Sequence, residues 1–220
     1  MGAVADVAVV TAIYDNYDGL KPVVPQAGLD VDWVLVTDQP PSDSLGWRVV
    51  HQPRPGVAPV RAAKRPKFRP WEYTEAPASI WVDAAFRVIS PDLAVGAMQY
   101  AEPIAQWVHP WRDCLYAEGQ EIIRLGMDPE GVAGPQMDRY REKGHPEHWG
   151  LWASGLIARV HSGAVKSFGR LWEREVTKGS YRDQVSEGYA LAQSGLRPKS
   201  LPGNHFSNPW VRHEPSARHR

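Results

Sequence analysis

The chain has 220 residues, of which 43% are hydrophobic and 23% charged, and its 25 Lys and Arg residues balance 25 Asp and Glu residues. This size and composition argue against extended disorder and predict one globular domain over residues 1–208, followed by a loose polar tail over 209–220. The zero net charge gives no support for nucleic-acid binding, which is typical of domains with a basic excess.

The cellular compartment is predicted from the cysteine content and the N-terminus. Cys114 is the single cysteine, so no internal disulfide can form, and a reducing compartment fits best. The first residues lack the basic and apolar segments of a signal peptide, and no apolar run reaches the length of a transmembrane helix. We therefore expect a cytoplasmic protein with no transmembrane segment.

The first half of the chain is rich in short apolar, β-branched runs, which are typical of buried strands. Residues 60–71 begin as a helix that Pro66 and Pro70 must bend or end, and Ser90-Pro91 resembles a helix start. We expect strands at 6–13, 33–37, 47–51, 79–82 and 104–108, with an extended segment at 86–89.

The second half of the chain is more helical, with one further strand expected at 156–160. Its cap residues predict helices over 113–125, from Ser162 to Gly179, and from Asp183 to Gly195. Strands that alternate with helices predict an α/β fold with a mostly parallel sheet covered on both faces. In such folds, ligands bind beyond the carboxyl ends of the strands, near a switch in strand order.

Two aspartates follow buried strands directly. Asp83 comes after SIWV, where a carboxylate can hold Mg²⁺ or Mn²⁺ together with substrate phosphates, or can simply cap the following turn. Asp38 ends the WVLVT strand, where it can accept hydrogen bonds from a ribose or a base, or start the next turn. Position alone leaves both alternatives open.

Two groups of charged residues are candidates for a binding site. A basic cluster can neutralise a diphosphate or form a solvated helix face; it contains Arg61, Lys64, Arg65, Lys67 and Arg69. A second group can form the wall of a site, or a helix cap with a surface ion pair; it contains His109, Arg112, Asp113 and Glu118.

The 10 Trp residues have two interpretations: a Trp-rich core, or rings that stack on a sugar, since an apolar ring with a polar tip suits such ligands. Glycine-rich dinucleotide and P-loop motifs are absent from the sequence, and the histidines lack the paired spacing of a zinc site.

Several segments, taken in order, resemble those of a known family. They are TAIYDNYDGLKP, VLVTDQ, R-x-x-K-x-x-K, SIWVDAAFRV, HPWRDCLYAEGQ, GHPEHWGLWASGLIARVH and DQVSEGYAL. The series resembles the glycosyltransferase-like domain family of the plant turgor-regulation-defect ceramidase and the mucilage-related pectin glycosyltransferases. The resemblance runs from about Val7 to Leu191. It implies a GT-A-like, Rossmann-like fold that binds a nucleotide-sugar, often with a divalent metal.

The resemblance also implies roles for individual residues. The nucleotide is bordered by Thr11, Ala12, Tyr14 and Asp38, and the phosphates by Arg61 and Lys64, with His109 and Arg112 at the edge of the pocket. Asp83 matches the first acid of a D-x-D-like element, and Asp183-Gln184 resembles a pair near the sugar or acceptor.

The chain departs from the family pattern directly after Asp83. Family members usually continue with Gly-Asn, whereas this chain has Ala84-Ala85, so a second oxygen ligand for Mn²⁺ or Mg²⁺ is missing. By analogy with glycogenin-like enzymes, His205 is the candidate for the other metal ligand.

The expected function is glycosyl transfer from a nucleotide-sugar, with a UDP-linked donor expected, to a glycan or other hydroxyl acceptor. Asp183 is a candidate base for the acceptor hydroxyl, unless it only caps its helix. The alternatives are a ceramidase-like amide hydrolase and a non-catalytic sugar- or nucleotide-binding module.

Overall fold

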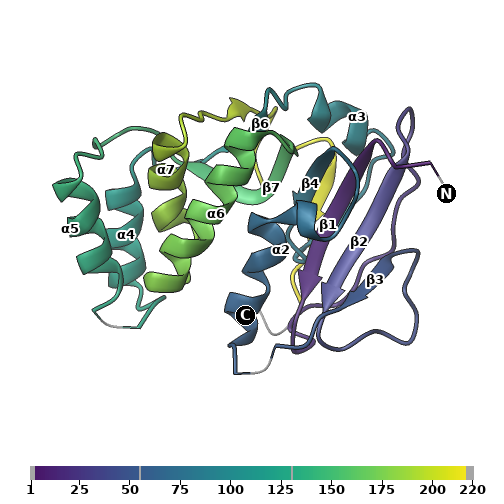
Figure 1. Ribbon diagram of the computed structural model, residues 1–220, viewed down its shortest axis with the longest axis horizontal. Coiled ribbons are helices and arrows are strands. Elements are labelled where there is room, and N and C mark those ends of the chain that lie inside the picture. The colour runs from purple at the N-terminus through teal and green to yellow at the C-terminus, as the bar shows by residue number, and fades with distance from the viewer. Residues whose placement is uncertain (1–2, 55, 130, 217–220) are drawn as a thin grey trace.

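A seven-stranded sheet forms the centre of the molecule (Figure 1). The computed structural model describes residues 3–54, 56–129 and 131–216. The strand order is β3–β2–β1–β4–β7–β6–β8. The strands are β1 (Val7–Ile13), β2 (Val31–Thr37), β3 (Arg48–His51), β4 (Ala78–Val82), β6 (Ile104–Val108), β7 (Trp152–Val160) and β8 (Lys199–Ser200). The predicted α/β class is confirmed.

The sheet is mostly parallel. Strands β1 to β4 run parallel to one another, and every residue of β1 is buried, as expected for a strand covered on both faces. Strand β7 is the exception, because it runs antiparallel to both β4 and β6. It also begins at Trp152, four residues before the start that the sequence predicted.

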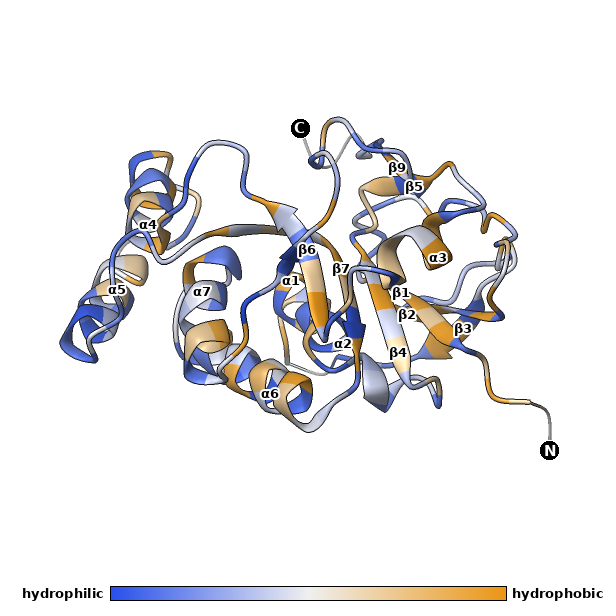
Figure 2. Cartoon of the chain, turned by 90° about the horizontal axis from the view of Figure 1, so that it is seen from above, coloured by the Kyte–Doolittle hydropathy of each residue, from blue (hydrophilic) through white to orange (hydrophobic). Residues whose placement is uncertain are grey.

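Helices cover both faces of the sheet (Figure 2). One apolar core lies under α3 (Leu93–Met98). The other lies under three helices, α2 (Lys64–Phe68), α6 (Gly163–Lys178) and α7 (Gln184–Gln193). A third apolar cluster joins α7 to α4 (Leu115–Arg124) and to α5 (Ala133–Glu142), a helix that the sequence analysis did not predict. Among the described residues, no helix is both long and apolar enough to cross a membrane.

The basic segment 60–71 folds as three short turns, namely α1 (Pro59–Ala62), α2 and the 3₁₀ helix η1 (Pro70–Glu72). Pro66 lies within the first turn of α2, where its missing N–H removes no helical hydrogen bond. The predicted bending of this segment by its prolines is confirmed.

Two predicted helix starts differ in detail. The helix expected to start at Ser90-Pro91 begins later, with Asp92 as its N-cap, and the Ser90 hydroxyl accepts a hydrogen bond from the Asp92 amide at 3.1 Å. Asp183 occupies the N-cap position of α7 without a capping hydrogen bond, because its carboxylate is engaged elsewhere. Ser162 does cap α6, accepting from the Val165 amide at 3.3 Å.

The segment expected to form a loose tail from residue 209 contains a strand that is paired with the rest of the domain. Strand β9 (Val211–His213) pairs antiparallel with β5 (Phe86–Val88). Trp210 is 4% exposed and packs so closely on α3 that a Cβ on Gly96 would lie 2.6 Å from its indole nitrogen. Apolar burial therefore holds this segment on the domain. Residues 217–220 lie outside the described residues.

Gly169 lets α6 approach α2, the helix that carries Lys64 and Lys67. A Cβ on Gly169 would collide with the backbone carbonyl of Phe68, which cannot move aside as a side chain can. We expect Gly169→Ala to lower the free energy of unfolding by about 2 kcal/mol or more. Gly163→Ala is the matched control, because its Cβ would meet open space, and it should be neutral or slightly stabilising. Urea denaturation measures both; equal stabilities would contradict the close approach.

Candidate functional site

A cleft of about 740 Å³ opens at the carboxyl ends of β1 and β4. The chain runs from β1 outward to β2 and β3, and then returns to β4 on the other side of β1. The cleft therefore lies at the switch in strand order, where open α/β sheets bind their ligands. Residues 153–155 of the antiparallel strand β7 complete its floor.

Asp83 projects into this cleft directly after β4. Its amide donates to the Gly155 carbonyl at 2.9 Å, which extends the β4–β7 pairing by one residue and fixes the backbone. One carboxylate oxygen, Oδ1, accepts a hydrogen bond from the Trp81 indole at 2.6 Å and lies 3.6 Å from the Lys67 ammonium. The side chain is 38% exposed, so the carboxylate remains accessible from the cleft.

A buried ion cluster lies beside Asp83. The Asp183 carboxylate lies 2.9 Å from the Lys64 ammonium and 2.7 Å from the Lys67 ammonium, and Lys67 also donates to the Ser154 hydroxyl at 2.9 Å. Although burial opposes it, the charge of the two lysines holds the pKa of Asp183 well below its usual range. Asp183 is therefore ionised at neutral pH and bound to two cations.

Lys67 is 1% exposed, which is rare for a lysine. Burial disfavours its charge, but the nearby carboxylates of Asp183 and Asp83 outweigh burial and raise the pKa of Lys67. Its ammonium also lies 5.9 Å from the centre of the Trp81 ring and 5.8 Å from that of Trp172, within the range of cation–π attraction. Lys67 is thus a permanent, fixed positive charge at the base of the cleft.

Behind the lysines lie two further ionisable side chains that the sequence analysis missed. Burial raises the pKa of Glu187 to about 8, so this side chain is mostly protonated at neutral pH, and Gln106 donates to it at 2.6 Å. Arg159 is fully buried and donates to the Lys67 carbonyl. The sequence feature that could have indicated Glu187 is its position four residues after Asp183, which places both on the same face of α7.

The cleft brings together seven of the residues to which a role in the site was assigned from the sequence. They are Ala12, Tyr14, Lys64, Asp83, Asp183, Gln184 and His205. It also contains Lys67, which the sequence had placed only in the basic cluster. Its spacing of three from Lys64 is typical of two residues on one helix face. Ser154, Arg182 and His213 line the cleft without having been singled out.

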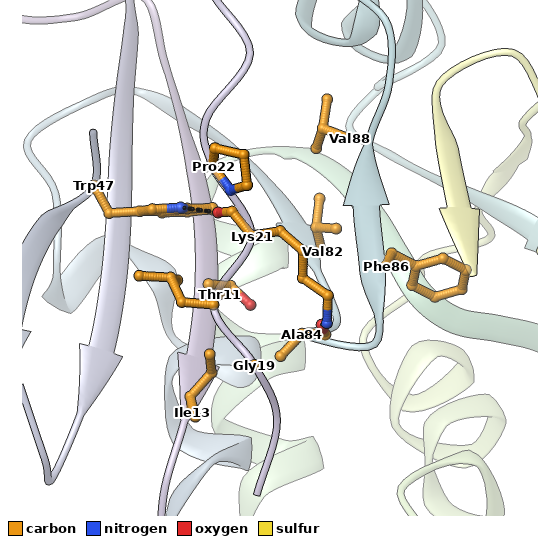
Figure 3. Close-up of a pocket in the computed structure, with 11 residues that line it drawn as sticks. Thr11, Ile13, Gly19, Lys21, Pro22, Trp47, Val82, Ala84, Phe86 and Val88 are labelled. Carbon is orange, nitrogen blue, oxygen red and sulfur yellow. Dashed lines mark hydrogen bonds between the residues drawn. The ribbon is translucent and has the colours of Figure 1, made fainter. Parts of the chain in front are cut away.

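Thr11 lies in a separate, smaller cavity beneath residues 19–22 (Figure 3). This cavity has a volume of about 20 Å³, enough for about one water molecule. Figure 3 shows the Lys21 side chain reaching the Ala84 carbonyl, to which it donates, while the Trp47 indole donates to the Lys21 carbonyl at 2.8 Å. These contacts fix the loop that follows Asp83.

The remaining named residues lie outside the cleft lining and have structural partners. Asp38 accepts from Arg54 at 2.6 Å, and Arg61 donates to two backbone carbonyls at the end of α6. Arg112 donates to Glu118 at 2.5 Å, and the His109 ring accepts from the Arg112 amide at 3.1 Å. Arg112 and Glu118 therefore form an ion pair, which was one of the alternatives to a site wall.

The expected divalent metal would lie in this cleft, at Asp83 and His205. Asp83 and His205 both line it, but the described residues contain no group of three His, Cys, Asp or Glu side chains placed to hold a metal ion. Oδ1 of Asp83 already faces an indole N–H and an ammonium, and a metal cation beside that ammonium would be repelled. The donor set at Asp83 therefore does not fit a divalent cation.

Comparison with known proteins supports the fold. The chain resembles the solved apo structure of the bifunctional glycosyltransferase WbbM, with a TM-score of 0.50 and 14% sequence identity over 90% of this chain. The chain spans only 39% of that neighbour's length. The fold is thus of the α/β, GT-A-like type.

Comparisons of sequence give no family. No family model matches the chain, and no curated protein matches it. Membership of the plant ceramidase and pectin glycosyltransferase family therefore stays a prediction.

Proposed function

We propose that the chain is a glycosyltransferase that moves a sugar from a nucleoside-diphosphate donor, with UDP as the first candidate, to a hydroxyl acceptor. The observation that carries this proposal is the placement of Asp83 beside the Lys64–Asp183–Lys67 cluster, in a cleft at the switch in strand order. The likeness to a glycosyltransferase fold supports it.

The cations of the cleft fit a departing diphosphate. Lys64 is partly exposed and lines the cleft, as does Arg182, whose side chain has no hydrogen-bond or ion-pair partner within residues 3–54, 56–129 and 131–216. Arg182 is therefore available for bidentate contact with phosphate oxygens. Fixed positive charge where negative charge develops lowers the barrier without any reorganisation.

Asp83 suits the acceptor hydroxyl better than Asp183 does. Two ammonium groups bind Asp183 and depress its pKa, and a base whose pKa lies far below the operating pH is inefficient. By contrast, Oδ2 of Asp83 has no hydrogen-bond partner in the described structure, and its side chain is 38% exposed. We assign Asp83 to the acceptor hydroxyl, and Asp183 to holding the two lysines.

In this proposal, Lys67 takes the place of a metal at Asp83. Its ammonium lies 3.6 Å from Asp83 and supplies fixed positive charge at that point of the cleft. Nucleotide binding should therefore be independent of divalent cations.

A thermal-shift panel tests the proposed function. We expect one of UDP, GDP, ADP or CDP, or its sugar conjugates, to stabilise the chain by about 2.7 kcal/mol when present at about 100 times its Kd. The stabilisation should be equal in EDTA and in Mn²⁺, and a nucleotide-sugar should release its diphosphate on incubation. If a nucleotide stabilised the chain in Mn²⁺ but not in EDTA, the role of Lys67 would be contradicted, while the transferase would still be supported. No stabilisation by any nucleotide would refute the transferase.

The two alternative functions make different predictions. A non-catalytic module would bind the nucleotide-sugar without releasing the diphosphate. A ceramidase-like hydrolase would cleave an N-acyl sphingosine and ignore nucleotides. No contact in the cleft favours either alternative over transfer.

A further inference from the structure

One tryptophan stands apart from the other nine. Seven of the 10 Trp residues are at most 8% exposed, and Trp71 and Trp149 are half-buried. The structure therefore assigns most of them to the core. Trp111 is 65% exposed. Since burying an aromatic ring is strongly favourable, an exposed Trp held in place needs a separate explanation.

Trp111 belongs to an aromatic group that we call the aromatic platform, formed by Trp111, His205 and Phe206. The Trp111 ring centre lies 5.3 Å from that of Phe206 and 5.8 Å from that of His205. His205 and Phe206 are 3.7 Å apart. Phe206 is 60% exposed. Two large rings from segments distant in sequence thus meet at the surface.

Both loops of the platform are fixed by hydrogen bonds. The Asn204 side-chain oxygen accepts from the Phe206 amide at 2.9 Å and from the Ser207 amide at 3.0 Å. A Cβ on Gly203, which has a φ of +78°, would collide with the Ser207 carbonyl. On the other loop, the buried His109 ring accepts from the Arg112 amide. The rings are therefore presented in advance, so little ordering entropy is lost on binding.

The platform continues into the proposed active site, because His205 also lines the cleft. We propose that the aromatic platform is the acceptor subsite and binds a carbohydrate, whose apolar ring face stacks on Trp111 and Phe206. A pyranose has one apolar C–H face and a rim of hydroxyls, which matches exposed aromatic rings bordered by polar loop atoms. This inference rests on the proposed function, which requires an acceptor beside the donor.

Sugar binding tests the platform with four neutral trisaccharides as probes, namely those of glucose, galactose, mannose and N-acetylglucosamine. At least one should bind to the wild type in a saturation-transfer NMR titration and protect Trp fluorescence from acrylamide quenching. Trp111→Ala and Phe206→Ala should each weaken that binding by about tenfold. Ile123→Ala is the control, because Ile123 is also exposed (49%) but lies on α4. All variants should keep the wild-type thermal shift with nucleoside diphosphate.

The possible results separate this inference from the proposed function. If no trisaccharide binds, or if the platform variants bind like the wild type, the acceptor subsite is refuted, while nucleotide binding still supports the transferase. If Trp111→Ala instead abolishes a dimer seen by sedimentation velocity, the platform is a protein interface and the inference fails. Trp111-dependent sugar binding without any nucleotide binding would support the platform as a carbohydrate site, but it would refute the transferase and, with it, the acceptor role.

Discussion

Lys67→Met should lower the free energy of unfolding by about 3 kcal/mol or more, because it leaves the buried Asp183 carboxylate with one cation in place of two and Asp83 with none nearby. The same substitution should weaken nucleoside-diphosphate binding at least tenfold. Chemical denaturation and the thermal-shift panel measure the two effects.

Lys178→Met is the matched control for this substitution. Lys178 is exposed in the last turn of α6, so its loss should change stability by less than about 0.5 kcal/mol. If Lys67→Met were as stable as this control, the buried cluster would contribute nothing to the fold.

The same cluster sets the acid stability of the chain. Since the pKa of Asp183 is lowered on folding, its contribution to stability is present above the unfolded value of about 3.9 and is lost as the pH falls below it. Asp183→Asn should therefore flatten the loss of stability between about pH 4 and pH 2, which denaturation at a series of pH values would detect. An acid profile as steep as that of the wild type would show that other carboxylates control it.

Asp83→Asn should reduce diphosphate release by about 10²- to 10⁴-fold, the range for loss of a positioned base, while donor binding remains. The amide keeps the size of the carboxylate and the hydrogen bond from Trp81, so only the proton-accepting charge is lost. Initial rates with the nucleotide-sugar identified by the panel measure the effect.

Asp138→Asn is the control for Asp83→Asn, because Asp138 is an exposed residue of α5 paired with Arg141. It should keep the wild-type rate. If Asp83→Asn also kept that rate, the acceptor hydroxyl would be activated by another group. If it lost donor binding instead, Asp83 would belong to the donor side of the cleft.

The sequence by itself determined the elements around the site. The apolar, β-branched runs predicted β1, β2, β4 and β6, because a strand buried on both faces needs such residues along its whole length. A shorter run of this kind predicted β3, which lies at the edge of the sheet and is partly exposed. The acidic residue directly after SIWV was likewise visible as a strand-end carboxylate. Local patterns define these features, so one sequence is sufficient to predict them.

Only the tertiary structure decided which charged residues meet. Lys64 and Lys67 precede Asp183 by 119 and 116 residues in the chain. Only the packing of α2 against α6, and of α6 against α7, brings their ammonium groups within 3 Å of the Asp183 carboxylate. The same packing turned Asp183 from a predicted helix cap into the partner of two lysines. It also separated Thr11, Arg61, His109 and Arg112 from the cleft, and left Trp111 as the exposed tryptophan at its edge. Contacts between distant segments depend on how apolar faces pack, and that packing is a property of the whole chain rather than of any local pattern.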